Sequence, residues 1–220
     1  MDLGIDIRHR IAKRAAKEIK NGMIVNLGIG IPSLIPNHVA CSMPVMFHAE
    51  NGIIGLGASP NQGEEDENLC NAAGYPVTTI EGSSYCDSAT AFAMIRRGYV
   101  DITVLGALEV SEKGDLANWI VPGKRVPGMG GAMELAQKAK KVIVLMNHTS
   151  KTGKPKLVKR CSLPVTATQC VSLIITDRAV FKVEKDVLLL TEIMAPYTVE
   201  DILNSTDATV RLSEKIITIA

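Results

Sequence analysis

A single glutamate stands where a buried strand is expected to end, and glycines follow it closely. The apolar residues 45–47 predict the strand. The residues that come next are Glu50, Asn51, Gly52, Gly55 and Gly57. One interpretation is that Glu50 ends the strand and that Asn51-Gly52 turns the chain. The other is that Glu50 is a reactive carboxylate and that the glycines let a ligand approach bare N–H groups. Taken alone, the stretch favours the turn.

A second glycine cluster, residues 128–131, precedes a helix expected to begin at Ala132. Gly130 and Gly131 would present unblocked N–H donors at the positive end of that helix. This suits an anion, or an oxyanion that forms during a reaction. The alternative is a helix packed tightly on a sheet through small residues, and the residues themselves leave both interpretations open.

The glycine turns do not match those of nucleotide-binding proteins. Gly28-Ile29-Gly30 has Ser33 where the third glycine of a dinucleotide-binding turn belongs, and Gly55-Leu56-Gly57 has Pro60 there. No Gly-Lys-Ser/Thr sequence of a P-loop is present. These turns therefore indicate close approach of the backbone to a ligand, not NAD or ATP binding.

Other chemistry has less support. The four histidines (9, 38, 48 and 148) lack metal-ligand spacing, and the five cysteines include no Cys-x-x-Cys pair. We therefore predict reduced thiols and no metal. His48 is two residues from Glu50 on the same face of the strand, so we expect a contact between them to be only local, and a role of His48 in the chemistry is the less favoured alternative. Ser83 and Ser84 lack a Gly-x-Ser-x-Gly context and are interpreted as helix-capping residues.

The elements that must position these residues alternate between strand and helix up to about residue 146 and become hairpin-like afterwards. The expected strands are 23–27, 45–47, 77–80, 100–105, 142–146, 171–176, 179–183 and 187–193, with a hairpin at 108–119, and the expected helices are 5–21, 34–40, 84–95, 132–141 and 198–203. This order predicts one α/β domain, residues 1–220, with a mostly parallel open sheet flanked by helices and an antiparallel portion.

The composition restricts the partners. Hydrophobic residues make up 46% of the 220 and charged residues 21%, which is enough for a full core. With 24 basic and 23 acidic residues the formal charge is +1, so neither nucleic acid nor a membrane is the expected partner. No apolar run reaches the roughly 18 residues of a membrane span, and no signal peptide is visible. We expect a cytoplasmic location.

Several motifs in one order resemble a known family. Residues 50–57 resemble the Glu-Asn-Gly signature of the β (B) subunit of class I coenzyme A transferases. The other matching motifs are 26–32, 83–89, 114–119, 122–124, 128–133 and 161–164. The resemblance covers roughly residues 8–201 and is strongest to β subunits of bacterial 3-oxoacid (acetoacetate-type) CoA-transferases. It implies the CoA-transferase (NagB/RpiA-like) fold.

The resemblance also implies a mechanism. Glu50 would be the nucleophile, and a carboxylate is already ionised at neutral pH, so it needs no general base. CoA would move between an acyl-CoA and a 3-oxoacid or short-chain acid, by ping-pong kinetics through a glutamyl-CoA thioester. Gly131, with Gly130 beside it, would stabilise the oxyanion. The residues expected along the CoA arm are Asn51, Gly52, Gly55, Gly57, Gly28, Gly30 and Lys124.

The resemblance further implies a partner and leaves an alternative. An α (A) subunit completes the site in this family, within an α2β2 hetero-oligomer, and CoA is a substrate, with no other cofactor. Two departures bear on substrate identity: residues 71–75 lack the lysine of many relatives, and Glu109 stands where many have glutamine. The alternative is a non-catalytic ligand-sensing or scaffold domain of the same fold.

Overall fold

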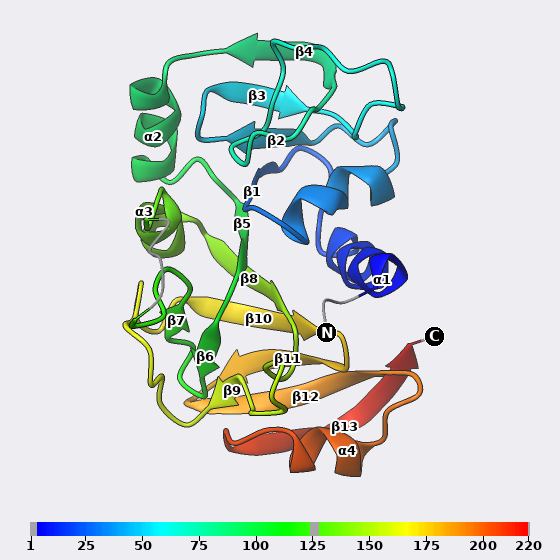
Figure 1. The fold of residues 1–220 in the computed structure, drawn as a ribbon, viewed down its shortest axis with the longest axis vertical. Helices are drawn as coiled ribbons and strands as arrows, with labels where there is room; N and C mark the ends of the chain where they lie inside the picture. The colour runs from blue at the N-terminus through cyan, green and yellow to red at the C-terminus, as the bar shows by residue number, and fades with distance from the viewer. Residues whose placement is uncertain (1–3, 124–127, 220) are drawn as a thin grey trace.

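The computed structural model describes residues 4–123 and 128–219, and its main feature is a ten-stranded sheet (Figure 1). The strand order is β13-β12-β11-β10-β8-β5-β1-β2-β3-β4. The sheet strands are β1 (Ile24–Leu27), β2 (Met46–Ala49), β3 (Ile53–Leu56), β4 (Thr79–Tyr85), β5 (Ile102–Gly106), β8 (Lys141–Met146), β10 (Val171–Thr176), β11 (Ala179–Glu184), β12 (Val187–Met194) and β13 (Val210–Ile219). A small second sheet contains β6 (Glu109–Ser111), β7 (Leu116–Ala117) and β9 (Leu157–Val158).

The centre of the large sheet is parallel. Strands β2, β1, β5, β8 and β10 run in one direction, whereas β3 and β4 on one side and β11 on the other are antiparallel to their neighbours. The sequences of β5 and β8 are almost continuously apolar, as expected of parallel strands covered on both faces. The predicted fold class is confirmed.

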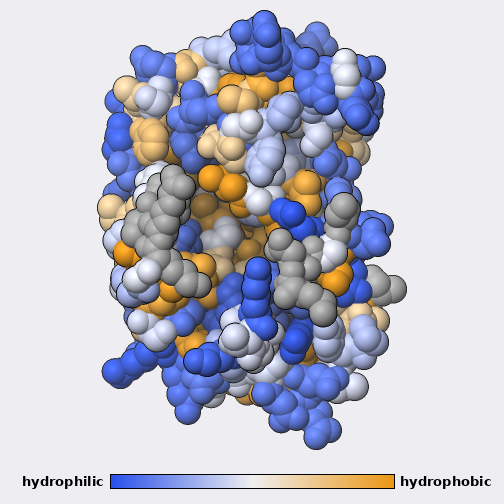
Figure 2. All heavy atoms as spheres, in the orientation of Figure 1, coloured by the Kyte–Doolittle hydropathy of each residue, from blue (hydrophilic) through white to orange (hydrophobic). Residues whose placement is uncertain are grey.

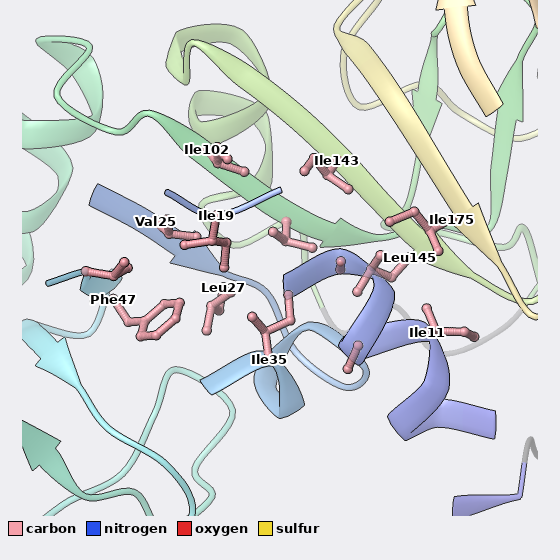
Figure 3. Close-up of a cluster of buried hydrophobic side chains, with 14 of the residues drawn as sticks. Ile11, Ile19, Val25, Leu27, Ile35, Phe47, Ile102, Ile143, Leu145 and Ile175 are labelled. Atoms are coloured by element: carbon pink, nitrogen blue, oxygen red, sulfur yellow. The ribbon is translucent and has the colours of Figure 1, made fainter. Parts of the chain in front are cut away.

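Helices cover both faces of this sheet (Figure 1). They are α1 (Ile5–Ala16), the 3₁₀ helix η1 (Pro32–His38), α2 (Ser88–Arg96), α3 (Ala132–Lys138) and α4 (Val199–Asn204). On one face, Ile11 and Ile19 from the α1 segment and Ile35 from η1 meet Val25 and Ile102 of the sheet (Figure 3). A second core cluster, on the other face, contains side chains of α2 and α3.

Several predicted elements differ from the structure. The strand expected at 77–80 is β4, Thr79–Tyr85, because these residues pair with β3 through Ile53 and Tyr85. Ser83 and Ser84 are therefore strand residues, and Asp87 caps α2 by accepting from the Thr90 N–H at 2.7 Å. The helix expected at 34–40 is the 3₁₀ helix η1, which has Pro36 inside it. Within the described residues, no helix is long and apolar enough to cross a membrane.

Candidate active site

Glu50 lies at the carboxyl edge of the parallel sheet, directly after β2. The chain does turn there: β2 and β3 form a hairpin in which Ala49 pairs with Ile53. Gly52 has a φ of +113°, and a Cβ at this position would lie 2.0 Å from the Cys86 carbonyl oxygen. Only glycine fits, because both the conformation and the space exclude a side chain. The turn interpretation is thus correct for Asn51-Gly52, and it leaves the half-buried Glu50 side chain at the strand end.

A row of buried polar side chains crosses the sheet beneath Glu50. Asn26 of β1 is paired with His48 of β2 on one side and with Thr103 of β5 on the other. All three side chains are fully buried. The Asn26 Nδ2 group donates to Oε2 of Glu50 at 3.0 Å, and the Thr103 hydroxyl donates to Oδ1 of Asn26 at 3.2 Å. Glu50 is therefore connected to the interior of the sheet through a carboxamide.

His48 takes part in this row as a neutral ring. Its Nδ1 lies 3.2 Å from Asn26 Nδ2, and its Nε2 lies 3.3 Å from the Ala91 carbonyl oxygen in α2. Since an amide Nδ2 can only donate and a carbonyl can only accept, Nδ1 is the acceptor and Nε2 carries the hydrogen. Burial lowers the pKa of His48, which favours this neutral form. His48, for which the sequence predicted only a local contact with Glu50, hydrogen-bonds to Asn26 and α2 instead.

Gly131 contacts α2, the helix that also accepts the hydrogen bond from His48. It is the buried N-terminal cap residue of α3, and a Cβ on it would lie 3.0 Å from the Phe92 ring. Phe92 follows Ala91, which accepts the His48 hydrogen bond. Gly131 is therefore closely packed, but against the helix α2 and not, as the packing alternative predicted, against the sheet. Gly130 is exposed with a φ of +55°, and its role as an N–H donor stays a prediction.

The glycines predicted along a CoA arm fall into two groups. Gly30 and Gly57 line a cavity of about 430 Å³. Its other lining residues are Arg8, His9, Leu27, Ser33, Leu34, Pro36, Leu56, Ser59, Pro60, Glu65, Asn71, Tyr75, Pro76 and Val77. Gly28, Gly52 and Gly55 do not line it. Each of these three has atoms of a neighbouring segment within 3.0 Å of where its Cβ would be, so packing accounts for them. Gly57 meets both conditions, since it lines the cavity and its Cβ would lie 2.4 Å from the Thr78 hydroxyl.

The cavity and the polar row lie on opposite faces of the sheet. Leu27 and Leu56, which line the cavity, belong to the core under α1 and η1, whereas His48 points toward α2. One loop connects the two sites: Asn71 lines the cavity, and the Cys70 carbonyl accepts from the exposed Asn51 side chain at 2.8 Å. Lys124, the remaining predicted residue, lies outside the described residues.

The two departures from the family pattern also have definite surroundings. Tyr75 stands in the 71–75 segment that lacks a lysine; it is exposed and lines the cavity. The Glu109 carboxylate accepts from the N–H and the hydroxyl of Ser162, both at 2.7 Å, so it is held by the loop opposite. Near it, Lys156 donates to the Ala107 carbonyl at 2.9 Å, and burial lowers the pKa of Lys156 to about 8.

Figure 2 shows a hollow near the middle of one face, over the part of the sheet where β1, β5 and β8 lie in Figure 1. Hydrophobic side chains gather at its rim and floor. Within residues 4–123 and 128–219, no group of three His, Cys, Asp or Glu side chains could hold a metal ion. The site as described offers a half-buried carboxylate beside a buried amide and a buried imidazole. N–H donors from Gly130 and Gly131 at this carboxylate stay a prediction.

Comparison with protein families and curated proteins gives one consistent result. Residues 8–205 match the family model "Coenzyme A transferase". A Bacillus subtilis protein, named as the beta subunit of a probable coenzyme A transferase, is 60% identical over 96% of this chain and 98% of its own length. The B subunit of the Helicobacter pylori succinyl-CoA:3-ketoacid coenzyme A transferase is 47% identical over 92% of this chain and 97% of its own length. A human mitochondrial succinyl-CoA:3-ketoacid coenzyme A transferase is 47% identical, with 41% of its length covered.

Solved structures show that this fold is shared. An acyl-CoA transferase from Escherichia coli O157:H7 superposes with a TM-score of 0.78 at 24% identity, over all of this chain and 44% of its own. The decarboxylase AibA/AibB gives a TM-score of 0.73 at 21% identity, over 99% of this chain and 90% of its own. At such identities the likeness concerns the fold alone, and a decarboxylase among these structures means that the chemistry must be argued from residues.

Proposed function

This chain belongs to the coenzyme A transferase family, and from that premise we propose that it is the β subunit that supplies the nucleophile, Glu50, for a glutamyl-CoA thioester. The observation that carries this proposal is the position of Glu50. It is a half-buried carboxylate at the carboxyl edge of a parallel sheet, held by a fully buried amide. Ligands of open α/β sheets bind at this edge.

The proposed reaction has two steps in each half. One Glu50 oxygen attacks the acyl-CoA carbonyl carbon, the C–S bond breaks, and CoA leaves as the thiolate, giving an acyl-glutamyl anhydride. The thiolate then attacks the glutamyl carbon, and the first acid leaves as a carboxylate together with the attacking oxygen. Glu50 is now a thioester of CoA, and a second carboxylate reverses these steps.

Both covalent intermediates are readily hydrolysed, so water must be excluded from them. The half-buried position of Glu50 between the buried hydrophobic residues Ala49 and Ile53 supports this requirement. We propose that the Gly131 N–H stabilises the oxyanion, a contribution of roughly 3 kcal/mol for one donor. We further propose that the CoA arm passes Asn51 and enters the cavity lined by Gly30 and Gly57, with Lys124 near the arm.

The relatives' names support the partner and the substrates proposed here. Several are named as beta or B subunits, which implies a second kind of chain in their assemblies. In the human relative, this chain aligns with less than half of a longer chain. We propose an α2β2 assembly with a CoA-transferase α subunit. Because the relatives from Helicobacter pylori and human are named succinyl-CoA:3-ketoacid coenzyme A transferases, we propose a short-chain acyl-CoA and a 3-oxoacid as the substrates.

The experiment is to trap the thioester. The chain is co-expressed with its α subunit, incubated with succinyl-CoA or acetoacetyl-CoA, reduced with borohydride and mapped by peptide mass spectrometry. We expect modification of the peptide that contains Glu50, and a loss of activity of about 10⁴-fold in Glu50→Gln. The matched control is Glu184→Gln, which changes a partly exposed carboxylate on β11 that pairs with Arg211, and this variant should keep full activity. Modification of another residue, or an active Glu50→Gln enzyme, would contradict the proposal.

A further inference from the structure

The buried row beneath Glu50 contains more polar groups than strand pairing requires. Asn26, His48 and Thr103 are fully buried in the middle of parallel strands. A buried polar side chain weakens such a strand unless its hydrogen bonds are satisfied. Here they are satisfied mainly by one another, and the row ends at Glu50. The hydrogen bonds therefore run from Thr103 inside the sheet, through Asn26, to the half-buried carboxylate of Glu50.

We propose that Asn26 and Thr103 are positioning residues that determine which oxygen of Glu50 attacks. This inference rests on the proposed function of Glu50 as the nucleophile. The Asn26 amide holds Oε2 at 3.0 Å. Within residues 4–123 and 128–219, Oε1 has no hydrogen-bond partner. One oxygen is thus anchored, and the other keeps its lone pairs free for the acyl carbon.

Thr103 matters because an asparagine side chain can be turned over. If the Asn26 amide rotated by half a turn, its oxygen would face the Glu50 carboxylate and repel it. The Thr103 hydroxyl opposes this rotation, since it donates to Oδ1 of Asn26 at 3.2 Å. In the rotated form the hydroxyl could only accept from Nδ2, and its own hydrogen would lose this buried acceptor. A hydroxyl two strands away thereby orients the carboxylate through one amide.

His48 supports the same orientation from the other side. Its unprotonated Nδ1 lies 3.2 Å from Asn26 Nδ2, so it favours the amide nitrogen over the amide oxygen at this place. The Ala91 carbonyl keeps the hydrogen of the ring on Nε2. The two neighbours of Asn26 therefore select one amide orientation, and preset geometry of this kind lowers the reaction barrier instead of improving substrate binding.

The test uses pairs of near-isosteric variants in the complete complex with the α subunit. Thr103→Val keeps the shape and removes the hydroxyl, whereas Thr103→Ser keeps the hydroxyl and removes a methyl group. Asn26→Asp replaces the donor by an acceptor. The control is Thr176→Val. Thr176 lies on β10, away from Glu50, and its equally buried hydroxyl contacts His148. For each variant, kcat and KM for the acyl-CoA, the rate of thioester formation on Glu50 and the urea midpoint are measured.

We expect thioester formation and kcat to fall about 100-fold in Asn26→Asp and about tenfold in Thr103→Val, with KM within about threefold of wild type. Thr103→Ser should keep kcat within about threefold, although it leaves a small cavity. Thr176→Val should lower the urea midpoint only. Equal losses of kcat in Thr103→Val and Thr103→Ser, or a wild-type kcat in Asn26→Asp, would overturn the inference. Absence of a thioester on Glu50 in the wild-type complex would instead contradict the proposed function.

Discussion

Two buried histidines mark two polar clusters at the carboxyl ends of parallel strands, and the clusters end differently. His48 on β2 belongs to the row that ends at the half-buried carboxylate of Glu50. His148, just after β8, hydrogen-bonds to Thr176 and to Thr206, both at 3.0 Å. The Thr206 hydroxyl donates to a carbonyl of α4 at 2.7 Å, so this second cluster ends within the protein.

The difference indicates how to interpret buried polar groups. Both histidine rings are fully buried and in both burial lowers the pKa, so neither burial nor protonation distinguishes the clusters. What distinguishes them is the last group. In the His148 cluster every hydrogen bond joins parts of the fold, which is a structural role. In the His48 cluster the last acceptor is the Glu50 carboxylate, which has one oxygen free among the described residues, and this is the arrangement that the proposed nucleophile requires.

The largest expected effect comes from removing His148, the centre of the cluster whose hydrogen bonds all end within the protein. His148→Ala removes a fully buried ring that joins β8, β10 and the segment after α4. It leaves the buried hydroxyl of Thr176 and the partly buried hydroxyl of Thr206 without that partner. We expect a loss of about 3–4 kcal/mol in the free energy of unfolding, measured by urea denaturation. The kcat of folded, assembled enzyme should stay within about twofold of wild type. A large loss of kcat would show that the His148 cluster contributes to the reaction.

The next effect is a pH dependence that the His148 cluster should impose. Unfolded His148 binds a proton near pH 6.5, whereas burial first, and then Arg178 and Lys156, lower its folded pKa to about 3. The unfolded state therefore binds more protons between these values. The stability that neutral His148 contributes is complete above pH 6.5 and is lost as the pH falls toward 3.

The measurement compares wild type with His148→Gln at about pH 7, 6, 5 and 4 by urea unfolding. Below about pH 6, the stability of wild type should fall faster than that of the variant by about 1.4 kcal/mol per pH unit. His48 also has a lowered pKa, but it is common to both proteins and cancels in the difference. Parallel pH profiles would mean that His148 is protonated in the folded state or titrates normally.

The sequence predicts part of the His48 cluster, which ends at Glu50. The apolar run and the Asn51-Gly52 pair correctly place Glu50 at a strand end. Asn26 stands inside another apolar run, and a polar residue in a strand covered on both faces must have buried partners. The sequence therefore indicates that such partners exist. It does not identify them, because they depend on the register of three strands, with Asn26 facing His48 and Thr103.

The errors in the predicted elements have the same origin. Ser83 and Ser84 have the composition of a helix cap, yet they form part of β4 because β3 offers a partner for their backbone. Residue type alone groups the CoA-arm glycines together, whereas the structure separates Gly30 and Gly57 in the cavity from Gly28, which packs on Val104. Local composition predicts that a turn or strand exists, and long-range pairing decides what it touches.

A smaller effect is expected at α2, which contacts both parts of the proposed site. Its Ala91 carbonyl accepts a hydrogen bond from His48, and its Phe92 ring packs against Gly131 of the second glycine cluster. In Gly131→Ala the new Cβ would lie 3.0 Å from the Phe92 ring, so the ring or the start of α3 must shift by a few tenths of an ångström. We expect kcat to fall about tenfold. Shortening the contact side chain in Gly131→Ala/Phe92→Leu should restore part of the loss. No recovery would mean that the loss does not come from this contact.

The smallest effect belongs to the other link between α2 and α3, an ion pair in which Arg96 lies 3.1 Å from Glu134. The two side chains are 50% and 39% exposed, so water screens their attraction. We expect Arg96→Ala to change the free energy of unfolding by less than about 0.5 kcal/mol and to leave kcat unchanged. Glu134→Ala is the matched partner variant and should behave alike. A tenfold loss of kcat in either would show that the helices transmit changes to the site through their exposed surface, and the buried contacts at Ala91 and Phe92 would then not be the main connection.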